Sequence, residues 1–294
     1  MRTTSSTGSV DRLIGLLHRF EVQVTLIDGV DPLRRPQDYG TGGREPCGHL
    51  HVLGRGAVDL RPIGGSDVPA RRLEGPALVL IPGAAPHRIV PVDGPALTCA
   101  ALRFAHGEGH PLVRALPRVL DVPTGEVPGL GSSLGLLAAE VDHVRCGAPL
   151  VASRLLEVIL LQLLRWVFDH PQEAGISRGL VQGMADPGIA GALTAVHEEP
   201  GAAWSLDELA RTATMSRSAF AARFRELVGE TPAAYVAGYR VALAKQGLLR
   251  GQQVASLAAE LGYANGSGLS RAFTAHTGQS PSAWLAATRS RSPA

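Results

Sequence analysis

The chain has 294 residues, of which 45% are hydrophobic and 18% are charged, and its formal net charge is +2. This length favours two globular domains, and the small charge excess does not by itself indicate nucleic-acid binding. No stretch reaches the roughly 18 apolar residues of a membrane span, and the first ten residues lack the apolar core of a signal peptide. The three cysteines have no framework spacing, so we expect a reducing, cytoplasmic setting.

The N-terminal third of the sequence predicts many short strands. Residues 1–9 are predicted to be a disordered tail, and residues 10–20 are predicted to form a short amphipathic helix. After that the hydrophobic period becomes that of strands broken by Gly and Pro turns, and the clearest strands are 21–28, 49–62, 77–83, 87–92 and 97–104. Many short strands without intervening helices predict a sandwich or barrel.

Three residues of metal-ligand type alternate along one predicted strand. Cys47, His49 and His51 are two residues apart, so their side chains share one face, and His87 opens a later strand after the turn PGAAP. His-x-His followed by Pro-x4-His resembles the cupin barrel, whose two motifs supply metal ligands to the barrel interior. The resemblance covers about residues 10–106. The family's glutamate after His-x-His is missing, and Arg55 stands at about its place.

Three interpretations of these side chains stay open. They line a pocket or face solvent without metal. Alternatively, Cys47, His49, His51 and His87 bind one Zn²⁺, because one thiolate and three imidazoles complete the tetrahedral shell that zinc prefers. The third interpretation is a metal with an open position for catalysis, against which the missing glutamate argues.

From residue 125 to about residue 183 the pattern is helical. Predicted helices cover 132–144 and 149–170, and residues 175–188 form a linker. The second helix has an apolar stripe too wide for packing on one small barrel; it consists of Leu155, Leu156, Ile159, Leu160, Leu163, Leu164, Val167 and Phe168. Such a helix is either buried within the monomer or part of a dimer interface.

The C-terminal part contains one pattern twice, at a constant offset of 49 residues. The first copy is Phe220, Phe224, Gly229, Thr231, Pro232, Tyr235 and Arg240, and the second is Leu269, Phe273, Gly278, Ser280, Pro281, Trp284 and Arg289. A repeat kept in register at this period predicts duplicated supersecondary units.

Each copy has the start and stop signals of two helices joined by a tight turn. Ser205 and Glu208 form a predicted capping box, and Ser216 begins a second helix that Gly229 ends. Helix, turn, helix is an arrangement whose second helix enters the DNA major groove. The alternative is a pair of ordinary amphipathic helices in a bundle. A predicted helix from Pro232 to about residue 249 joins the copies.

The segment from about residue 186 to 289 resembles the AraC/XylS DNA-binding domain, whose signature runs here through VASLAAELGYANGSGLSRAFTAHTGQSPSAWL. The resemblance implies base contacts from the exposed early positions of both reading helices, which are Ser218, Ala221 and Ala222, and Ser267, Ser270 and Arg271. It implies phosphate contacts or internal ion pairs for Arg217, Arg223, Arg225 and Arg240. Gly266 and Gly268 depart from the family pattern, and glycine costs about 1 kcal/mol in a helix.

The order of barrel, helices and DNA-binding domain resembles the cupin-type AraC regulators. In that group the connecting helices commonly dimerise, which favours the dimer interpretation of residues 149–170. Cys99 resembles a cysteine that some of these regulators use to sense oxidants; the alternative is a small buried hydrophobe.

We therefore expect an α+β two-domain protein. Residues 1–124 form a cupin-like sensor barrel, 125–185 a helical dimerisation segment and linker, and 186–294 an all-α domain with two helix-turn-helix units. The expected function is sequence-specific transcription regulation controlled by a small molecule, a metal or an oxidant, and no enzyme activity. The expected partners are double-stranded DNA, RNA polymerase and a second copy of the chain. The alternative is a metal-dependent cupin enzyme with a helical appendage.

Overall fold

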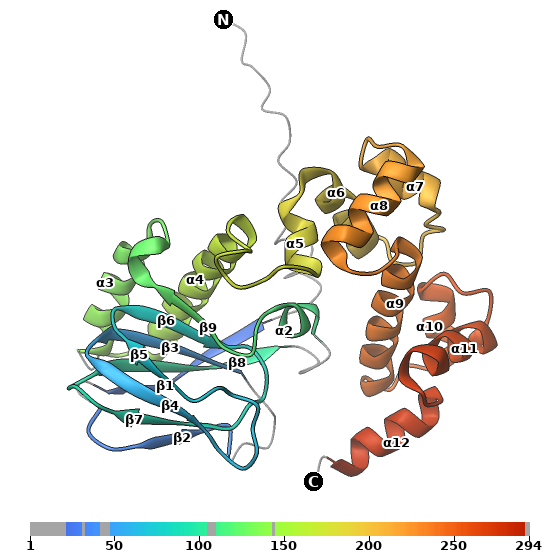
Figure 1. Cartoon of the computed structure of the whole chain (residues 1–294). Helices are drawn as coiled ribbons and strands as arrows, with labels where there is room; N and C mark the ends of the chain where they lie inside the picture. Colours follow the sequence, from blue (N-terminus) through green and yellow to red (C-terminus); the bar gives the residue numbers. More distant parts are fainter. Residues whose placement is uncertain (1–21, 31–32, 42–47, 105–109, 143–144, 292–294) are drawn as a thin grey trace, which may run out of the picture. The chain divides into compact units, whose positions relative to one another are not determined.

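The computed structural model describes residues 22–30, 33–41, 48–104, 110–142 and 145–291 (Figure 1). The chain forms two compact units, one spanning Phe20–Ser177 and the other containing Arg178–Ala294. The predicted tail, the predicted helix over 10–20 and Cys47 lie outside the described residues.

Two antiparallel sheets make up the strand part of the first unit (Figure 1). The larger has the order β1-β8-β3-β6-β9, and the smaller has the order β2-β7-β4-β5. The strands are β1 (Val22–Val30), β2 (Gln37–Tyr39), β3 (Gly48–Arg55), β4 (Ala57–Pro62), β5 (Arg71–Glu74), β6 (Ala77–Ile81), β7 (His87–Pro91), β8 (Ala96–Phe104) and β9 (Leu120–Pro123). Four of the predicted strands are present, but the single strand predicted over 49–62 is two strands, β3 and β4, which belong to different sheets and are separated at Gly56 with φ +72°. Strands β2, β5 and β9 are additional.

Strands β3 and β6 are buried on both faces, which is why the apolar residues there run almost without interruption. Alternate residues of the larger sheet point to the smaller sheet, where they meet Val58, Leu60, Leu73 and Ile89 in one core. The described strands form two separate sheets, so the closed barrel stays a prediction.

Helices cover the other face of the larger sheet. They are α3 (Leu130–Val141) and α4 (Ala148–Asp169), preceded by α2 (Pro111–Ala115) and the short 3-10 turn η2 (Thr124–Glu126). Helix α4 packs on β1, where Ser153 Oγ accepts a hydrogen bond from the Leu26 N–H at 3.1 Å. The wide apolar stripe of α4 is buried within the chain except for the half-buried Leu155. The stripe therefore does not require a dimer to cover it.

The second unit is all-helical and follows the predicted boundaries closely. It contains α5 (Leu180–Ala185), α6 (Pro187–Glu198), α7 (Leu206–Thr212), α8 (Arg217–Val228), α9 (Pro232–Leu249), α10 (Val254–Glu260), α11 (Gly266–Thr277) and α12 (Pro281–Arg291). Helix α5 lies inside the stretch that we expected to be a linker. Among the helices of the described residues, none has both the length and the apolar character needed to cross a membrane.

Candidate functional site

The first helix-turn-helix unit consists of α7 and α8. The capping box predicted at the start of α7 is present: Ser205 Oγ accepts from the Glu208 N–H at 3.2 Å, and Glu208 Oε2 accepts from the Ser205 N–H at 2.8 Å. The turn contains Thr214 at φ +54°, a left-handed conformation that reverses the chain in few residues. Ser216 then caps α8 by accepting a backbone hydrogen bond at 3.3 Å.

Helix α8 buries one face and exposes the predicted reading face. Phe220 and Phe224 lie in the core and contact each other, with ring centroids 5.5 Å apart. Ser218 and Ala222 are exposed and Ala221 is half-buried. This exposure is what base contact requires, while the contact itself stays a prediction.

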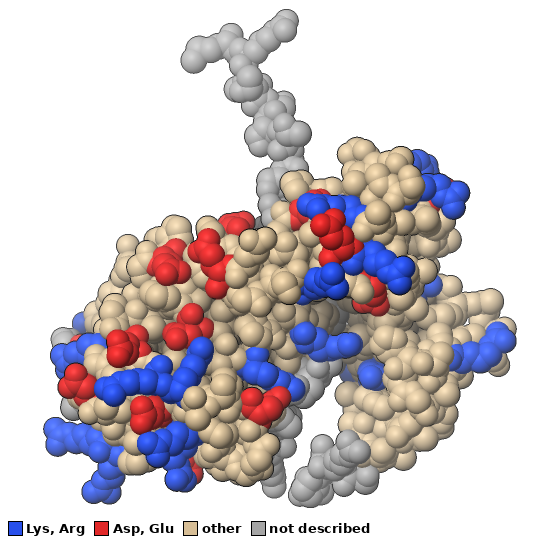
Figure 2. Space-filling view, viewed as in Figure 1, with Lys and Arg blue, Asp and Glu red and all other residues tan. Residues whose placement is uncertain are grey.

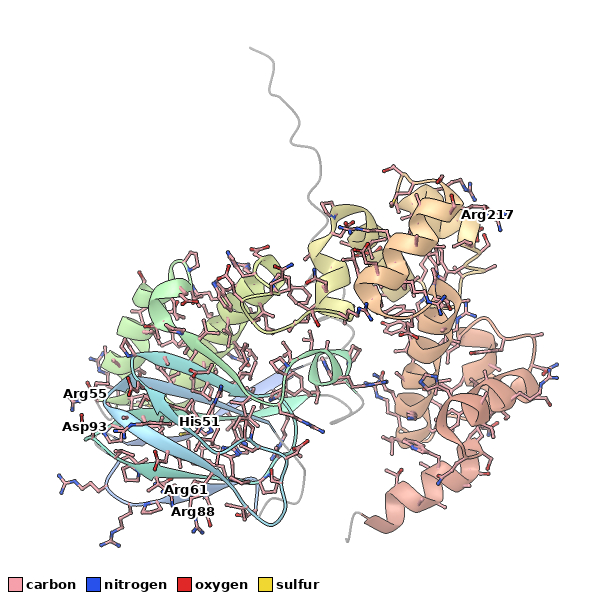
Figure 3. All side chains as sticks on the ribbon, viewed as in Figure 1. His51, Arg55, Arg61, Arg88, Asp93 and Arg217 are labelled. Atoms are coloured by element: carbon pink, nitrogen blue, oxygen red, sulfur yellow. The ribbon has the colours of Figure 1, made fainter. Side chains whose placement is uncertain are left out.

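Two arginines of α8 form ion pairs with nearby carboxylates. Arg217 points away from the helices (Figure 3) and pairs with Asp207 at 2.9 Å. Arg223 donates to Asp186 at 3.1 Å and to Glu226 at 3.0 Å, and these bonds raise its pKa. Basic and acidic side chains are accordingly interleaved over this region (Figure 2). These pairs match the internal ion pairs that we allowed for both arginines.

Arg240 has a different role from either one predicted. Its Nε donates to the Pro200 carbonyl and its terminal nitrogen to the Ala202 carbonyl, each at 2.6 Å. The guanidinium also lies over the Tyr263 ring, 5.6 Å from the centroid. Arg240 therefore ties α9 to the loop before α7 through backbone carbonyls, and burial lowers its pKa.

The second helix-turn-helix unit consists of α10 and α11 and is built in the same way. Asn265 caps α11 by accepting from the Gly268 N–H at 2.9 Å, and Leu269 and Phe273 are buried. Ser267 and Arg271 are exposed and Ser270 is half-buried. Both predicted reading helices therefore present their early positions to solvent.

Helix α9 links the two helix-turn-helix units and contacts helices of both, including α8 and α11. Its 18 residues span roughly 27 Å at 1.5 Å per residue. Successive major-groove faces lie about 34 Å apart along DNA. The length of α9 is thus of the right order for two reading helices on adjacent turns.

A second chemically distinctive cluster lies between the sheets of the first unit. His49 and His51 come from β3, His87 from β7, Tyr39 from β2 and Cys99 from β8, and all five side chains are buried. His51 lies in the interior of the unit in Figure 3. We call these five residues the histidine–thiol cluster.

The hydrogen bonds of the cluster determine its tautomers. His87 Nδ1 lies 2.8 Å from the Ala85 carbonyl, which can only accept, so this nitrogen carries the proton. His87 Nε2 is then an acceptor, and His51 Nε2 donates to it at 2.9 Å. His51 Nδ1 is in turn left to accept from the Cys99 thiol at 3.0 Å. A single chain of donors therefore runs from the thiol to Ala85.

The electrostatics of the cluster favour neutral rings. Burial lowers the pKa of His49 to about 3, and the nearby His87 contributes to this shift. Burial also lowers the pKa values of His51 and His87. Neutral imidazole is the form that accepts a proton from a thiol or binds a metal.

The structure brings three of the four predicted metal ligands together, while the metal itself stays a prediction. His49, His51 and His87 converge, with ring centroids between 5.1 and 5.9 Å apart. Tyr39, which we did not predict, lies 3.1 Å from Cys99 through its hydroxyl. Cys99 joins the cluster because β8 pairs with β3 in a register that puts Cys99 opposite His51. Arg55 lies at the end of β3 away from His51 (Figure 3), so it does not replace the family's glutamate inside the cluster.

The nitrogen atoms of His51 and His87 lie closer together than two ligands of one metal ion. Two imidazole nitrogens bound to one zinc at about 2.0–2.1 Å are roughly 3.3 Å apart in a tetrahedral shell. His51 Nε2 and His87 Nε2 are 2.9 Å apart and bonded to each other. Among the described residues, no group of three His, Cys, Asp or Glu side chains is arranged to hold a metal ion. The donor types suit zinc, but the observed geometry must open to admit it.

Comparison with known proteins gives two family matches. Residues 11–169 match the family model described as Cupin, and residues 209–287 match one described as a helix-turn-helix domain. The first match covers more than half of the chain.

Individual proteins agree with these matches. An AraC-like transcription regulator of Streptomyces antibioticus is 35% identical over 60% of this chain and 59% of its own length, so the matched region is less than two thirds of that protein. The Escherichia coli activator RclR is 27% identical over 83% of this chain and 86% of its own length. The crystal structure of the DNA-binding domain of AdpA with a target DNA is 32% identical, covers 34% of this chain and 91% of that chain, and has a TM-score of 0.31.

Proposed function

Because the chain belongs to the cupin family and carries an AraC-type helix-turn-helix domain, we propose that it is a sequence-specific DNA-binding transcription regulator, which acts as a homodimer and is controlled through its cupin domain. The observation that carries the proposal is the pair of capped reading helices, α8 and α11, with exposed early positions. Helix α9 holds them within one polypeptide, so each protomer would read two adjacent major-groove faces on an asymmetric site.

Mapping of the DNA bound by the protein in cells tests this function. We expect enriched fragments that the purified protein binds at least about a thousandfold more tightly than random DNA at the same salt concentration. Transcription assays on those fragments with RNA polymerase then distinguish activation from repression. The E. coli relative is named an activator, and we extend activation to this chain as part of the proposal. Equal affinity for enriched and random DNA would contradict the proposal.

A cupin enzyme with a helical appendage is the weaker candidate. The family's glutamate after His-x-His is missing from this chain, and Arg55 stands at about its place. The relatives described above are also named as regulators.

An oxidant is one input that the histidine–thiol cluster supports. His51 Nδ1 lies 3.0 Å from Cys99 Sγ, so the neutral ring can take the thiol proton as the sulfur attacks an oxidant. Hydrogen peroxide would transfer one oxygen to the sulfur, which gives the sulfenic acid, and its other oxygen would leave as water. We expect peroxide to change operator affinity in the native protein and in Cys146→Ser, but not in Cys99→Ser. Cys146 is the matched control because it is exposed. A response that survives Cys99→Ser would exclude this route.

Zinc is the second input that we propose for the same cluster. It would be held by His49, His51 and His87, with Cys47 as the fourth ligand, and it would supply a structural crosslink between β3 and β7. Elemental analysis of protein prepared without chelators should find close to one zinc per chain. A His49→Ala/His87→Ala double variant should lose it. Zinc far below stoichiometric in the native protein, or unchanged in the variant, would contradict the proposal.

A further inference from the structure

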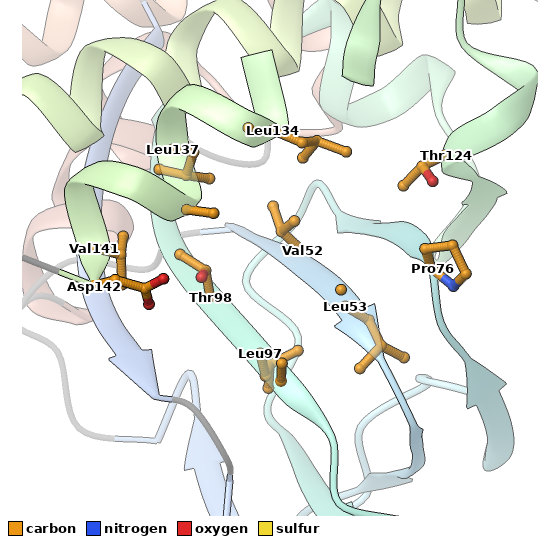
Figure 4. A pocket seen from close by; sticks show the side chains of 14 residues that line it. Val52, Leu53, Pro76, Leu97, Thr98, Thr124, Leu134, Leu137, Val141 and Asp142 are labelled. Atoms are coloured by element: carbon orange, nitrogen blue, oxygen red, sulfur yellow. The ribbon is translucent and has the colours of Figure 1, made fainter. Parts of the chain in front are cut away.

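The first unit contains a pocket of about 580 Å³ between helix α3 and the larger sheet (Figure 4). Its floor is formed by strands β3 and β8, with Val52 and Thr98. Its roof is helix α3, with Leu134, Leu137 and Val141. The pocket is therefore enclosed on two sides, by the sheet and by α3, whereas an exposed apolar surface is not enclosed.

The pocket exists because small residues occupy positions where the side chains of a helix and a sheet usually pack against each other. Gly135 and Ala138 line it from the helix and Gly54 from the strand. A Cβ added at Gly135 would meet no atom within 4 Å, and one at Gly54 would meet the nearest at 3.8 Å. Helix α3 is held over the sheet by its contacts with α4 and η2. The space between α3 and the sheet is therefore left unfilled by side chains.

The polar groups of the pocket are few and lie at its ends. Asp142 lies at one end, at the C-cap of α3, and Thr124 lies toward the other (Figure 4). Asp142 is exposed, and its carboxylate is the one acidic group among the residues that line the pocket. A mainly apolar pocket with one convergent charge is the usual form of a small-molecule site.

We propose that this pocket binds a small lipophilic amine, whose apolar body lies between α3 and the sheet and whose ammonium group pairs with Asp142. A volume of several hundred Å³ is that of sites for drug-sized ligands. The anionic end disfavours fatty acids and other carboxylates by like-charge repulsion.

A second copy of the chain is a poorer occupant. Leu136, the exposed apolar residue of α3, is two residues from Leu134, which corresponds to roughly 200° around the helix. An apolar surface that another protomer could cover is therefore on the far side of α3 from the pocket.

The pocket is connected to the histidine–thiol cluster through one layer of backbone. Val52 pairs with Thr98 in the register of β3 and β8, and the adjacent pair is His51 with Cys99. The first pair lines the pocket, and the second pair points into the cluster. A ligand that moves β3 against β8 would therefore alter the 3.0 Å contact between His51 and Cys99. This step, from binding to control of DNA affinity, rests on the proposed function, whereas binding itself does not.

Calorimetric titration of the full chain with 4-phenylbutylamine tests the site. Its alcohol and carboxylate counterparts, 4-phenylbutanol and 4-phenylbutyrate, test the charge preference. We expect the amine to bind about fivefold more tightly than the alcohol, the ratio for a partly exposed ion pair, and the carboxylate to bind most weakly. Asp142→Asn should abolish the preference for the amine, whereas Glu140→Gln, on the same helix and outside the pocket, should leave it unchanged.

A filled pocket gives a second, independent test. Ala138→Phe should abolish binding of all three compounds, while Leu136→Phe, on the other side of α3, should not; circular dichroism confirms that each variant is folded. Equal binding of the three compounds, an effect of Glu140→Gln equal to that of Asp142→Asn, or binding that survives Ala138→Phe would overturn the proposal. Binding without any change in operator affinity would keep the site and exclude it as the regulatory input. Amine binding by a protein without operator preference would leave the site and contradict the proposed function.

Discussion

Arg271 is an exposed guanidinium early in α11, at a position that the family resemblance assigns to base contact. A bidentate contact to guanine contributes about 1–3 kcal/mol of discrimination. We therefore expect Arg271→Ala to weaken operator binding by this amount and to affect random DNA much less, as measured by competition titrations at one salt concentration.

Arg250→Ala is the matched control, because Arg250 is exposed and lies after α9, outside both reading helices. It should weaken operator and random DNA alike, if it has any effect. An equal loss on both DNAs with Arg271→Ala would show that Arg271 contacts phosphate instead.

Glu208 gives a pH prediction for a single side chain. Hydrogen bonds from the backbone and hydroxyl of Ser205 lower its pKa below the usual 4.5. A carboxylate with a lowered folded-state pKa stabilises the fold above its unfolded pKa, and this contribution is lost as the pH falls through the folded value. The difference in unfolding free energy between the native protein and Glu208→Gln should therefore be largest above about pH 5 and shrink as the pH falls below the usual pKa of 4.5.

Urea unfolding of both proteins between pH 3 and pH 6 measures this difference. Glu260→Gln is the control, and its difference from the native protein should not follow that of Glu208→Gln. A constant difference across the range would mean that the capping box does not depend on the Glu208 charge.

The sequence identified the chemistry of the histidine–thiol cluster but not its partners. Alternation along β3 was enough to put His49 and His51 on one face. It could not reveal that Cys99 meets His51, because that contact depends on the register between β3 and β8. The sequence did not predict Tyr39 either. Strand β2 is only three residues long, which is too short for a periodic pattern, and its pairing with β7 defines it.

At the scale of elements, the start of α11 is a candidate for stabilisation. Gly266 and Gly268 have no left-handed φ, and an added Cβ would meet its nearest neighbours at 3.6 Å and 3.7 Å, which is ordinary contact. Alanine there should stabilise the helix by about 0.5–1 kcal/mol per position, because it loses less backbone entropy on folding.

Gly247, in α9, is the contrasting position. Its added Cβ would come within 2.2 Å of Leu257 and 2.4 Å of Gln252, so Gly247→Ala should destabilise the same unit. Hydrogen exchange followed by mass spectrometry localises both effects, with slower opening of α11 expected in Gly266→Ala and Gly268→Ala. Unchanged or faster opening would show that another feature limits that helix.

The helices of the second unit could be predicted because their ends carry local signals. Ser205, Ser216, Thr231 and Asn265 each accept the expected capping bond. Helix α5 has no side-chain cap at its start, and so it resembled linker sequence. The strands β5 and β9 are four residues each, too short for a periodic signal, and neighbouring strands define them.

At the scale of the whole molecule, the homodimer that we propose needs a surface other than the buried stripe of α4. Large apolar side chains remain exposed on α3 and α4, with Leu136 and Leu150 at 60% and 64% and Val151 and Val158 each at 44%. Val151 and Val158 are seven residues apart and therefore lie on one face of α4. Exposed apolar side chains that share a helix face mark interaction surfaces, and we propose that a second protomer covers this part of α4.

Charges introduced on that face test the dimer directly. We expect the native protein to sediment as a dimer at micromolar concentration, and Leu150→Asp/Val158→Asp to raise the dimer dissociation constant at least tenfold, which is about 1.4 kcal/mol. Leu249→Asp is the matched control, because Leu249 is an exposed leucine of α9 at 42%. Two facing carboxylates per protomer must lose water when the interface closes, whereas the monomer keeps them solvated, so the folded protomer should be unaffected. A monomeric native protein would mean that each protomer binds DNA alone through α8 and α11. A double variant that sediments like the control would mean that the dimer forms through another surface.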